Sequence, residues 1–336
     1  MRPVETWLYP TPAGLYCEPG NFYIDPPRPI DRALITHGHS DHARAGHGTV
    51  LATAETIAIM KVRYGAGCAG TFETAPLGRQ INVGGVAVRF VPAGHILGSA
   101  QIVIEHAGGR AVVSGDYKRA ADPTCRPFEP VPCDVFVTEA TFALPVFRHE
   151  RGADEALRLA RSISRNRERT HLLGVYGLGK CQRMIALLRE QGYHEPIWLH
   201  GALVALTSLY QQLGIELGVC RPASEASDSD LRGALVMCPP SAITDRWSRR
   251  MGDDPVRVFA SGWMRVRGRV RQRGIELPLV VSDHADWPEL LDTIAETGAE
   301  DIWVTHGRED ALVHQLGLMG RRSRALALVG YEDDAE

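Results

Sequence analysis

Residues 37–42 read His37-Gly38-His39-Ser40-Asp41-His42, directly after the apolar run 33–35. Four potential metal ligands therefore lie where a predicted strand ends in a tight turn, and imidazole and carboxylate are ligands that Zn²⁺ and similar ions prefer. His37 and His39 are two positions apart, so they project to one side of an extended segment, while Asp41 and His42 follow the turn and can face a second ion. The spacing suits two adjacent metals, as in phosphoester hydrolysis. The alternative is a solvated histidine-rich loop.

The composition predicts a globular protein of one large domain or two. Of 336 residues, 44% are hydrophobic and 23% charged, which is ordinary for such proteins. No apolar run approaches the ~20 residues of a membrane span, and the N-terminus lacks the layout of a secretory signal. The seven cysteines are scattered without a Cys-x-x-Cys pair, so we expect a cytoplasmic protein without disulfides or thiolate zinc.

Arginines cluster late in a sequence whose net charge is only −3. Only three of the 37 basic residues are lysines, and a GC-rich genome would explain this preference for arginine. Such a bias does not explain clustering, however, and residues 246–273 contain nine arginines but only two acidic residues. Five of these arginines alternate strictly, so that an extended strand would place them on one face: Arg265, Arg267, Arg269, Arg271 and Arg273. We expect either a stripe that follows a phosphate backbone or a solvated strand face.

The pattern of apolar residues changes near residue 145. Before it, short apolar runs between Gly and Pro turns predict strands, with one helix at 54–64; the runs are 22–24, 33–35, 86–91, 101–104, 111–113 and 135–137. After it, helices and strands alternate as in a parallel α/β domain, with helices at 153–166, 180–191 and 202–213 and strands at 171–176 and 196–199. Short buried strands return at 279–281 and 302–304.

Four further polar residues also follow short apolar runs: His95, Asp116, His284 and His306. Taken alone, each is most simply a turn or capping residue. Together with the cluster at 37–42, they predict a metal centre built at strand ends.

In this order of motifs the sequence resembles the metallo-β-lactamase fold family. The runs AGHILGSAQ, SGDY, TEATF, SDHAD and THG are similar to the β-CASP nucleases of that fold, whose members include Artemis and RNase J. The runs ITHGHSDHAR, GDYKR and SGWM resemble above all the bacterial ligase-associated DNA exonucleases. The resemblance covers about residues 14–310. It implies an α/β fold, a four-layer αβ/βα sandwich at 1–144 and 276–336, with an inserted α/β β-CASP cap at 145–275.

The resemblance also implies a set of metal ligands. His37, His39 and His95 would bind one divalent ion, Asp41, His42 and His306 would bind a second, and Asp116 would bridge them. The ions would be Zn²⁺, with Mn²⁺ as the alternative. Asp25 would support the ligands from behind, with Asp31 as the weaker candidate for that place.

Two residues outside the ligand set would serve the reaction. Glu139 matches the acidic motif of the β-CASP family, and His284 matches the histidine that contacts the scissile phosphate or protonates the leaving oxygen. The chemistry agrees, because two metals bridged by one carboxylate, here Asp116, activate a water. Asp41, as a ligand of the second metal, is counted with Asp116 among the catalytic residues. A histidine held by a carboxylate is suited to protonating the leaving group.

Two lysines are candidates for phosphate contacts. Lys118 lies two residues after Asp116 and is otherwise an ordinary surface lysine. Lys180 follows Gly177-Leu178-Gly179 at a predicted helix N-terminus. The spacing there is not that of a P-loop, yet free backbone N–H groups can still hold a phosphate. The alternative is a tight turn.

We therefore expect a metal-dependent phosphodiesterase, a DNA exonuclease of repair that acts with an ATP-dependent DNA ligase and a helicase. His306 is typical of the RNA-processing members, so an RNase J-like RNA nuclease is the first alternative. A small-molecule hydrolase would need neither the cap nor Glu139. A non-catalytic scaffold would have lost ligands that this sequence retains.

Overall fold

A computed structural model describes residues 3–328, which form two compact units. Within the described residues, 3–148 and 284–328 form unit 1, and His149–Asp283 form unit 2. The end of the predicted 276–336 segment lies outside the described residues. None of the helices within 3–328 has the length and apolar content needed to cross a membrane.

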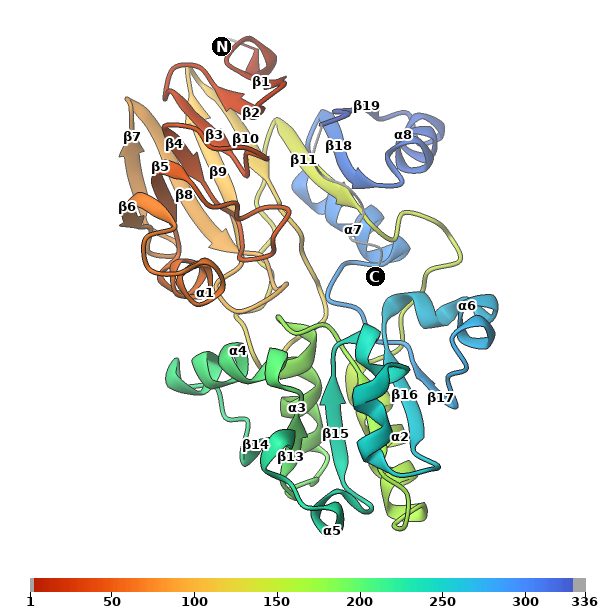
Figure 1. Ribbon diagram of the computed structural model, residues 1–336. Helices are drawn as coiled ribbons and strands as arrows, with labels where there is room; N and C mark the ends of the chain where they lie inside the picture. Colours follow the sequence, from red (N-terminus) through yellow and green to blue (C-terminus); the bar gives the residue numbers. More distant parts are fainter. Residues whose placement is uncertain (1–2, 329–336) are drawn as a thin grey trace. The chain divides into compact units, whose positions relative to one another are not determined.

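Unit 1 is built around two sheets (Figure 1). The first has the order β1-β2-β3-β4-β5-β6, with strands Leu8–Thr11, Gly14–Cys17, Phe22–Ile24, Arg32–Leu34, His47–Ala52 and Ala69–Thr74. The second has the order β19-β18-β11-β10-β9-β8-β7, with strands Arg322–Ala325, Asp301–Gly307, Val135–Ala140, Gly109–Val113, Ala100–His106, Val86–Pro92 and Gln80–Val83.

The two sheets pack face to face, and helices cover their outer faces. Apolar side chains from both sheets, among them Phe22, Phe90 and Trp303, form one buried cluster. The outer face of the first sheet packs on α1 (Ala54–Tyr64), and that of the second on α7 (Trp287–Thr297) and α8 (Glu309–Leu318). Since successive strand residues point to opposite faces, β8 sends Phe90 between the sheets and Val91 toward the helices. The result is the predicted four-layer αβ/βα sandwich.

Unit 2 is an α/β domain on a parallel sheet. Its strand order is β14-β13-β15-β12-β16-β17, with strands Cys220–Pro222, Ile197–Leu199, Leu235–Cys238, His171–Gly174, Val256–Ala260 and Leu277–Leu279. The helices are α2 (Gly152–Arg165), α3 (Lys180–Glu190), α4 (Gly201–Gln212), α5 (Asp228–Leu231) and α6 (Arg267–Gln272). Because β17 pairs with β16, the chain up to Asp283 belongs to unit 2, whereas the predicted boundary lay at 275.

The segment 265–273 is helical, and the predicted strand is wrong. A 3-10 turn at Gly262–Arg265 leads into α6. Positions that alternate with the arginines include Gly268 and Gln272, so a strand there would have no continuous apolar face to bury. On a helix, residues two apart are rotated by about 200°, and the alternating arginines therefore do not share a face.

The arginines of this segment have different surroundings. Arg265 pairs with Glu150 at 2.7 Å, and the guanidinium of Arg269 lies 4.1 Å from the ring centroid of Trp263. Arg267 and Arg271 are exposed and one helical turn apart.

Candidate metal centre

The segment 37–42 turns tightly after β4 and lies against α1. Arg63 of α1 donates a hydrogen bond from Nη1 to the carbonyl oxygen of Gly38 at 2.6 Å. A Cβ at Gly38 would lie 2.5 Å from Cγ2 of Ile59, so only glycine allows this approach. The turn is thereby fixed, and the histidine rings on either side of Gly38 face each other, with Nε2 of His37 3.2 Å from Nδ1 of His39.

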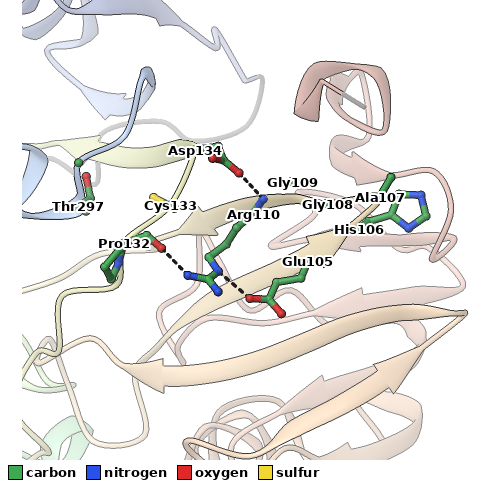
Figure 2. Close-up of a pocket in the computed structure, with 11 residues that line it drawn as sticks. Glu105, His106, Ala107, Gly108, Gly109, Arg110, Pro132, Cys133, Asp134 and Thr297 are labelled. Carbon is green, nitrogen blue, oxygen red and sulfur yellow. Dashed lines mark hydrogen bonds and ion pairs between the residues drawn. The ribbon is translucent and has the colours of Figure 1, made fainter. Parts of the chain in front are cut away.

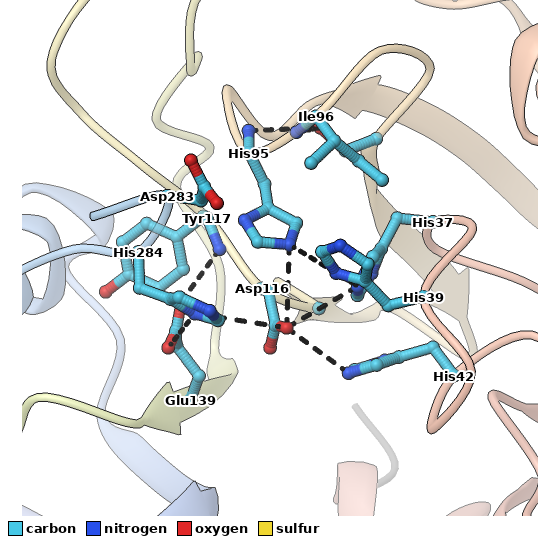
Figure 3. A network of polar contacts seen from close by, with 12 residues as sticks. His37, His39, His42, His95, Ile96, Asp116, Tyr117, Glu139, Asp283 and His284 are labelled. Carbon is cyan, nitrogen blue, oxygen red and sulfur yellow. Dashed lines mark hydrogen bonds and ion pairs between the residues drawn. The ribbon is translucent and has the colours of Figure 1, made fainter. Parts of the chain in front are cut away.

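His95 completes the first group of nitrogen ligands (Figure 3). Its Nε2 lies 3.0 Å from Nδ1 of His39. The loop that carries it is fixed by Ser99, whose Oγ accepts the backbone N–H of His95 at 3.1 Å and of Ile96 at 3.2 Å. Three imidazole nitrogens from two separate loops thus converge on one point.

Asp116 lies at the centre of the cluster. Its Oδ2 is 3.4 Å from Nε2 of His37, 3.5 Å from Nε2 of His42 and 3.7 Å from Nε2 of His95. Gly115 brings it there, because this residue has φ +56° and a Cβ on it would meet Thr36 at 2.7 Å. One carboxylate oxygen therefore faces both groups of predicted ligands.

The second group comprises Asp41, His42 and His306. Oδ2 of Asp41 lies 3.3 Å from Nε2 of His306 and 3.6 Å from Nε2 of His42, and the two imidazole rings stack with centroids 4.6 Å apart. His306 reaches this position near the end of β18 with a left-handed φ of 59°. The ligand atoms of each group lie within 4.8 Å of one another.

Asp25 is buried and contacts one of the predicted ligands, whereas Asp31 is exposed. Oδ2 of Asp25 lies 2.7 Å from Nδ1 of His42, on the side of the ring away from Asp116. Thr36 links this carboxylate to the cluster: its N–H donates to Asp25 at 2.8 Å, and its hydroxyl donates at 2.5 Å and lies 3.1 Å from Nδ1 of His37. Sequence reasoning missed Thr36, although a hydroxyl directly before the first ligand was a signal for it.

His284 and Glu139 form a buried pair beside Asp116. Nδ1 of His284 lies 2.9 Å from Oε2 of Glu139 and 3.9 Å from Oδ2 of Asp116. The backbone N–H of Tyr117 donates to Oε1 of Glu139 at 2.8 Å, so both carboxylate oxygens are held. Lys118 is half-buried, and its ammonium donates to the carbonyl oxygen of His284 at 3.4 Å.

The donor set fits divalent cations. Oδ1 of Asp41 and Oδ1 of Asp116 are buried, and neither has a hydrogen-bond partner among the residues that the structure describes. A buried carboxylate oxygen without a donor is costly, and a cation removes that cost. Imidazole nitrogens and carboxylate oxygens in this mixture suit Zn²⁺ and Mn²⁺ alike.

Comparison with known families agrees with this geometry. The family described as "Metallo-beta-lactamase superfamily" matches residues 24–162 of this chain. These residues include every predicted ligand except His306. The chain carries a metallo-β-lactamase superfamily domain.

Several curated relatives align with larger or smaller parts of the chain. The chain is 29% identical over 315 residues to a probable DNA ligase of Opitutus terrae, which aligns 88% of this chain with 28% of that protein. It is 32% identical over 135 residues to the cleavage and polyadenylation specificity factor subunit 3 of Dictyostelium discoideum, covering 37% and 17%. It is 30% identical over 198 residues to the endoribonuclease YSH1 of Mycosarcoma maydis, covering 48% and 22%. The chain thus spans less than a third of the length of each relative.

A solved structure shares the fold. The crystal structure of a protein of unknown function from Enterococcus faecalis V583 superposes with a TM-score of 0.59 at 14% identity, over 84% of this chain and 76% of that one.

The ionisable groups of the predicted metal centre shift one another's pKa values. Burial and the neighbouring His42 lower the pKa of His37 well below its usual value, which keeps this ligand neutral. Burial acts against the charged form of His42, but Asp116, Asp41 and Asp25 raise its pKa well above the usual value. Burial likewise acts against the carboxylate of Asp116, yet His42 and His284 hold its pKa well below the usual range. Metals bind deprotonated ligands, so a cation competes with the proton on His42.

Lys180 is not an exposed phosphate contact, and that prediction is wrong. Its side chain is fully buried, with the ammonium 3.6 Å from Oδ2 of Asp283 and 4.8 Å from the ring centroid of Tyr176. Its neighbour on α3, Arg183, donates to Asp283 at 2.8 Å. Sequence reasoning missed Arg183 because a buried arginine has no local pattern of its own.

A hollow of roughly 620 Å³ lies at the other end of β10, around the turn from Glu105 to Arg110 (Figure 2). There the guanidinium of Arg110 donates to Glu105 at 2.6 Å and to the carbonyl oxygen of Pro132 at 3.1 Å, and its backbone N–H donates to Asp134 at 2.7 Å. The charged groups of this hollow are therefore engaged with one another, and the predicted ligands all lie elsewhere.

Proposed function

We propose that the protein is a metal-dependent nuclease, a DNA exonuclease that hydrolyses phosphodiester bonds in repair. The observation that carries the proposal is the position of Asp116. Its Oδ2 lies within 3.4–3.7 Å of three imidazole nitrogens, and the His284–Glu139 pair stands beside it. Ligands for two ions and a proton donor in one buried cluster are the groups that two-metal phosphodiester hydrolysis uses.

The ligand residues would divide between two ions. His37, His39 and His95 would hold one, Asp41, His42 and His306 the other, and Asp116 would contact both. Bound Zn²⁺ or Mn²⁺ would activate a water and neutralise charge on the phosphate. Asp25 and Thr36 orient the rings of His42 and His37 through their Nδ1 atoms, so that Nε2 of each ring faces Asp116.

His284 would protonate the leaving sugar oxygen. Glu139 lies on its Nδ1, which makes that nitrogen the donor within the pair and leaves Nε2 for proton transfer. The buried carboxylate also compensates the charge of the ring when both nitrogens carry protons. Glu139 itself is oriented by the N–H of Tyr117 and acts through His284.

The DNA substrate and the cellular setting rest on the relatives. One relative, which aligns with 88% of this chain, is named a probable DNA ligase, and this supports DNA as substrate and a DNA ligase as partner. That the ligase is ATP-dependent is part of the proposal and comes from the resemblance of the motifs. A helicase partner, a cytoplasmic location and the assignment of unit 2 as a β-CASP domain complete the proposal. Lys118, Arg267 and Arg271 would contact phosphates.

An RNA nuclease is the second candidate. It is favoured by His306 and by relatives that are named endoribonucleases. Both candidates would use the same ligands, so only the substrate separates them.

Turnover of single-stranded DNA and RNA of one sequence, labelled at the 5′ or 3′ end, tests the proposal with Zn²⁺ and with Mn²⁺. We expect a ladder from DNA, and the labelled end that shortens gives the polarity. His284→Ala should keep the metal and cleave about 10²–10⁴-fold more slowly, the usual contribution of a general acid. Faster cleavage of RNA would favour the second candidate, and cleavage of neither polymer would overturn both.

A further inference from the structure

The segment between β17 and His284 is held by side chains of unit 2. After Leu279 the chain leaves the sheet, and the N–H of Val280 donates to Oε2 of Glu155 on α2 at 3.1 Å. Nη1 of Arg183 donates to the carbonyl oxygen of Ser282 at 2.6 Å and to Oδ1 of Asp283 at 2.8 Å. Two helices therefore anchor a short segment that follows the end of a strand.

The contacts at Asp283 are buried and charged. Asp283 and Arg183 are 2% and 3% exposed, and Lys180 adds a fully buried ammonium on the other carboxylate oxygen. Buried ion pairs seldom stabilise a fold more than apolar residues of the same volume would, because desolvation offsets their attraction. Such a pair fixes geometry instead, since its hydrogen bonds are directional. The position of this pair along the chain indicates what it fixes.

One peptide bond separates Asp283 from His284. On the far side of that bond, the N–H of Ala285 donates to the carbonyl oxygen of Tyr117 at 2.7 Å, and His284 itself contacts Glu139. The chain before this bond is thus held within unit 2 by Arg183, and the chain after it is held within unit 1 by Tyr117.

We propose that Arg183 and Lys180, acting through Asp283, are positioning residues for His284. This inference rests on the proposed nuclease function, in which His284 protonates the leaving oxygen. Glu139 orients the ring, and the Asp283 anchor restrains the residue that directly precedes His284 in the chain. Loss of the anchor should therefore slow the step that needs His284 without removing metal.

Arg183→Lys tests the proposal, because lysine keeps the positive charge on a shorter side chain, so its ammonium does not coincide with the Nη1 atom that donates to both Ser282 and Asp283. Arg189→Lys is the matched control on the same helix, where the guanidinium bonds backbone carbonyls of Leu217, Tyr193 and Val219. Asp283→Asn is a second variant of similar size, in case Arg183→Lys folds poorly. Metal content and the exchange of backbone amides in 280–285 are measured for each variant.

Two phosphodiesters separate positioning from general damage. DNA has a poor leaving group that needs a proton, whereas bis-p-nitrophenyl phosphate has a good one that does not. We expect Arg183→Lys to lower kcat on DNA roughly 10- to 100-fold, as misplaced catalytic groups do, with little change on the aryl ester. Amide exchange in 280–285 should quicken, and Arg189→Lys should change neither rate.

A double-mutant cycle shows whether Arg183 affects the cleavage rate through His284. If Arg183 acts through His284, Arg183→Lys should cause no further loss in the His284→Ala background. Additive losses, equal losses on both substrates, or an unchanged exchange rate in 280–285 would overturn the positioning role alone. A wild-type protein that cleaves neither DNA nor the aryl ester with metal would instead overturn the proposed function, and the positioning role with it.

Discussion

The two units bury polar side chains at strand ends in two different ways. In unit 1, Asp116 follows β10 and meets imidazoles whose nitrogens lie 3.4–3.7 Å away. In unit 2, Asp283 follows β17 and meets Arg183 at 2.8 Å and Lys180 at 3.6 Å. Both carboxylates are almost fully buried, at 3% and 2% exposure.

The difference lies in how the charge is compensated. The guanidinium of Arg183 carries a permanent positive charge, so Asp283 is neutralised by the chain itself. Histidines are neutral unless protonated, so Asp41 and Asp116 keep oxygens without a hydrogen-bond donor among the described residues. A buried acid among histidines thus implies a cation from outside, whereas a buried acid among arginines is part of the framework.

The largest effect is expected when a predicted nitrogen ligand is removed, because unit 1 should then no longer be stabilised by metal. After chelator treatment, added Zn²⁺ or Mn²⁺ should raise the thermal stability of the wild type, by about 4 kcal/mol when the free ion exceeds Kd a thousandfold. His39→Ala should lose this rise and the nuclease activity together. Scanning calorimetry and metal analysis measure both.

His171→Gln is the control in unit 2. His171 is buried like the ligands, but its Nε2 lies 2.9 Å from the hydroxyl of Ser162 and not among carboxylates. The variant should retain the full response to metal even if its starting stability falls. Loss of the response in both variants would mean that metal does not act at the cluster of unit 1.

Replacing Asp25, which lies behind the predicted ligand His42, should have a smaller effect on metal binding. Asp25→Asn keeps the shape but removes the negative charge on Nδ1 of His42, which lies 2.7 Å away. Outer carboxylates of this kind usually contribute about 10- to 100-fold to metal affinity. Competition with a coloured chelator measures the affinity. An affinity equal to that of the wild type would show that Thr36 alone suffices to orient the ligands.

Much of the fold could be predicted because its signals are local. Short apolar runs between Gly and Pro turns predicted β3, β4, β8, β9, β10, β11 and β18, and the helix at 54–64 is observed at Ala54–Tyr64. The strands β1, β2, β5, β6, β7 and β19 were not predicted. The strand at 279–281 was displaced, since β17 ends at Leu279. The residues after β17 are held by Glu155 and Arg183, through long-range contacts that leave no periodic trace in the sequence.

The residues of the candidate site could be predicted from the sequence for a different reason. His37 and Asp116 come shortly after β4 and β10, His306 lies near the end of β18, and the structure brings these strand ends together. Lys180 was misjudged because a glycine turn before a lysine looks the same whether the lysine meets solvent or Asp283. Regular alternation misled at 265–273, where the residues between the arginines do not form an apolar face.

The helical form of 265–273 sharpens the prediction for DNA binding. Arg267 and Arg271 are exposed and one turn apart, whereas Arg269 lies on Trp263. Arg267→Ala with Arg271→Ala should weaken binding of all sequences alike. It should also reduce the slope of log K against log salt by roughly 1.4, or about 0.7 for each single-strand phosphate contact.

Arg110→Ala controls for the loss of positive charge in that experiment, because its guanidinium is engaged with Glu105 and Pro132. It should leave the slope unchanged. A slope that is the same in the double variant and the wild type would identify α6 as a solvated helix.

The smallest effect is expected at ion pairs on the surface, where the two units should behave alike. Hydrogen bonds from Arg169 lower the pKa of Glu276 in unit 2, and those from Arg119 lower the pKa of Glu296 in unit 1. A carboxyl whose pKa is lower in the folded state stabilises the fold above its unfolded pKa of about 4.3, and this contribution is lost as pH falls through the folded pKa.

Glu276→Gln and Glu296→Gln should therefore each cost stability at pH 7, by no more than about 0.5 kcal/mol because solvent screens exposed pairs. The cost should shrink toward zero as the pH is lowered below about 4. Calorimetry of the variants and the wild type across this range measures it. A cost that grew on acidification would have the wrong sign for a depressed carboxyl pKa. A cost of several kcal/mol in only one unit would show that its pair is buried in solution, and the contrast between the units would then extend from their strand ends to their surfaces.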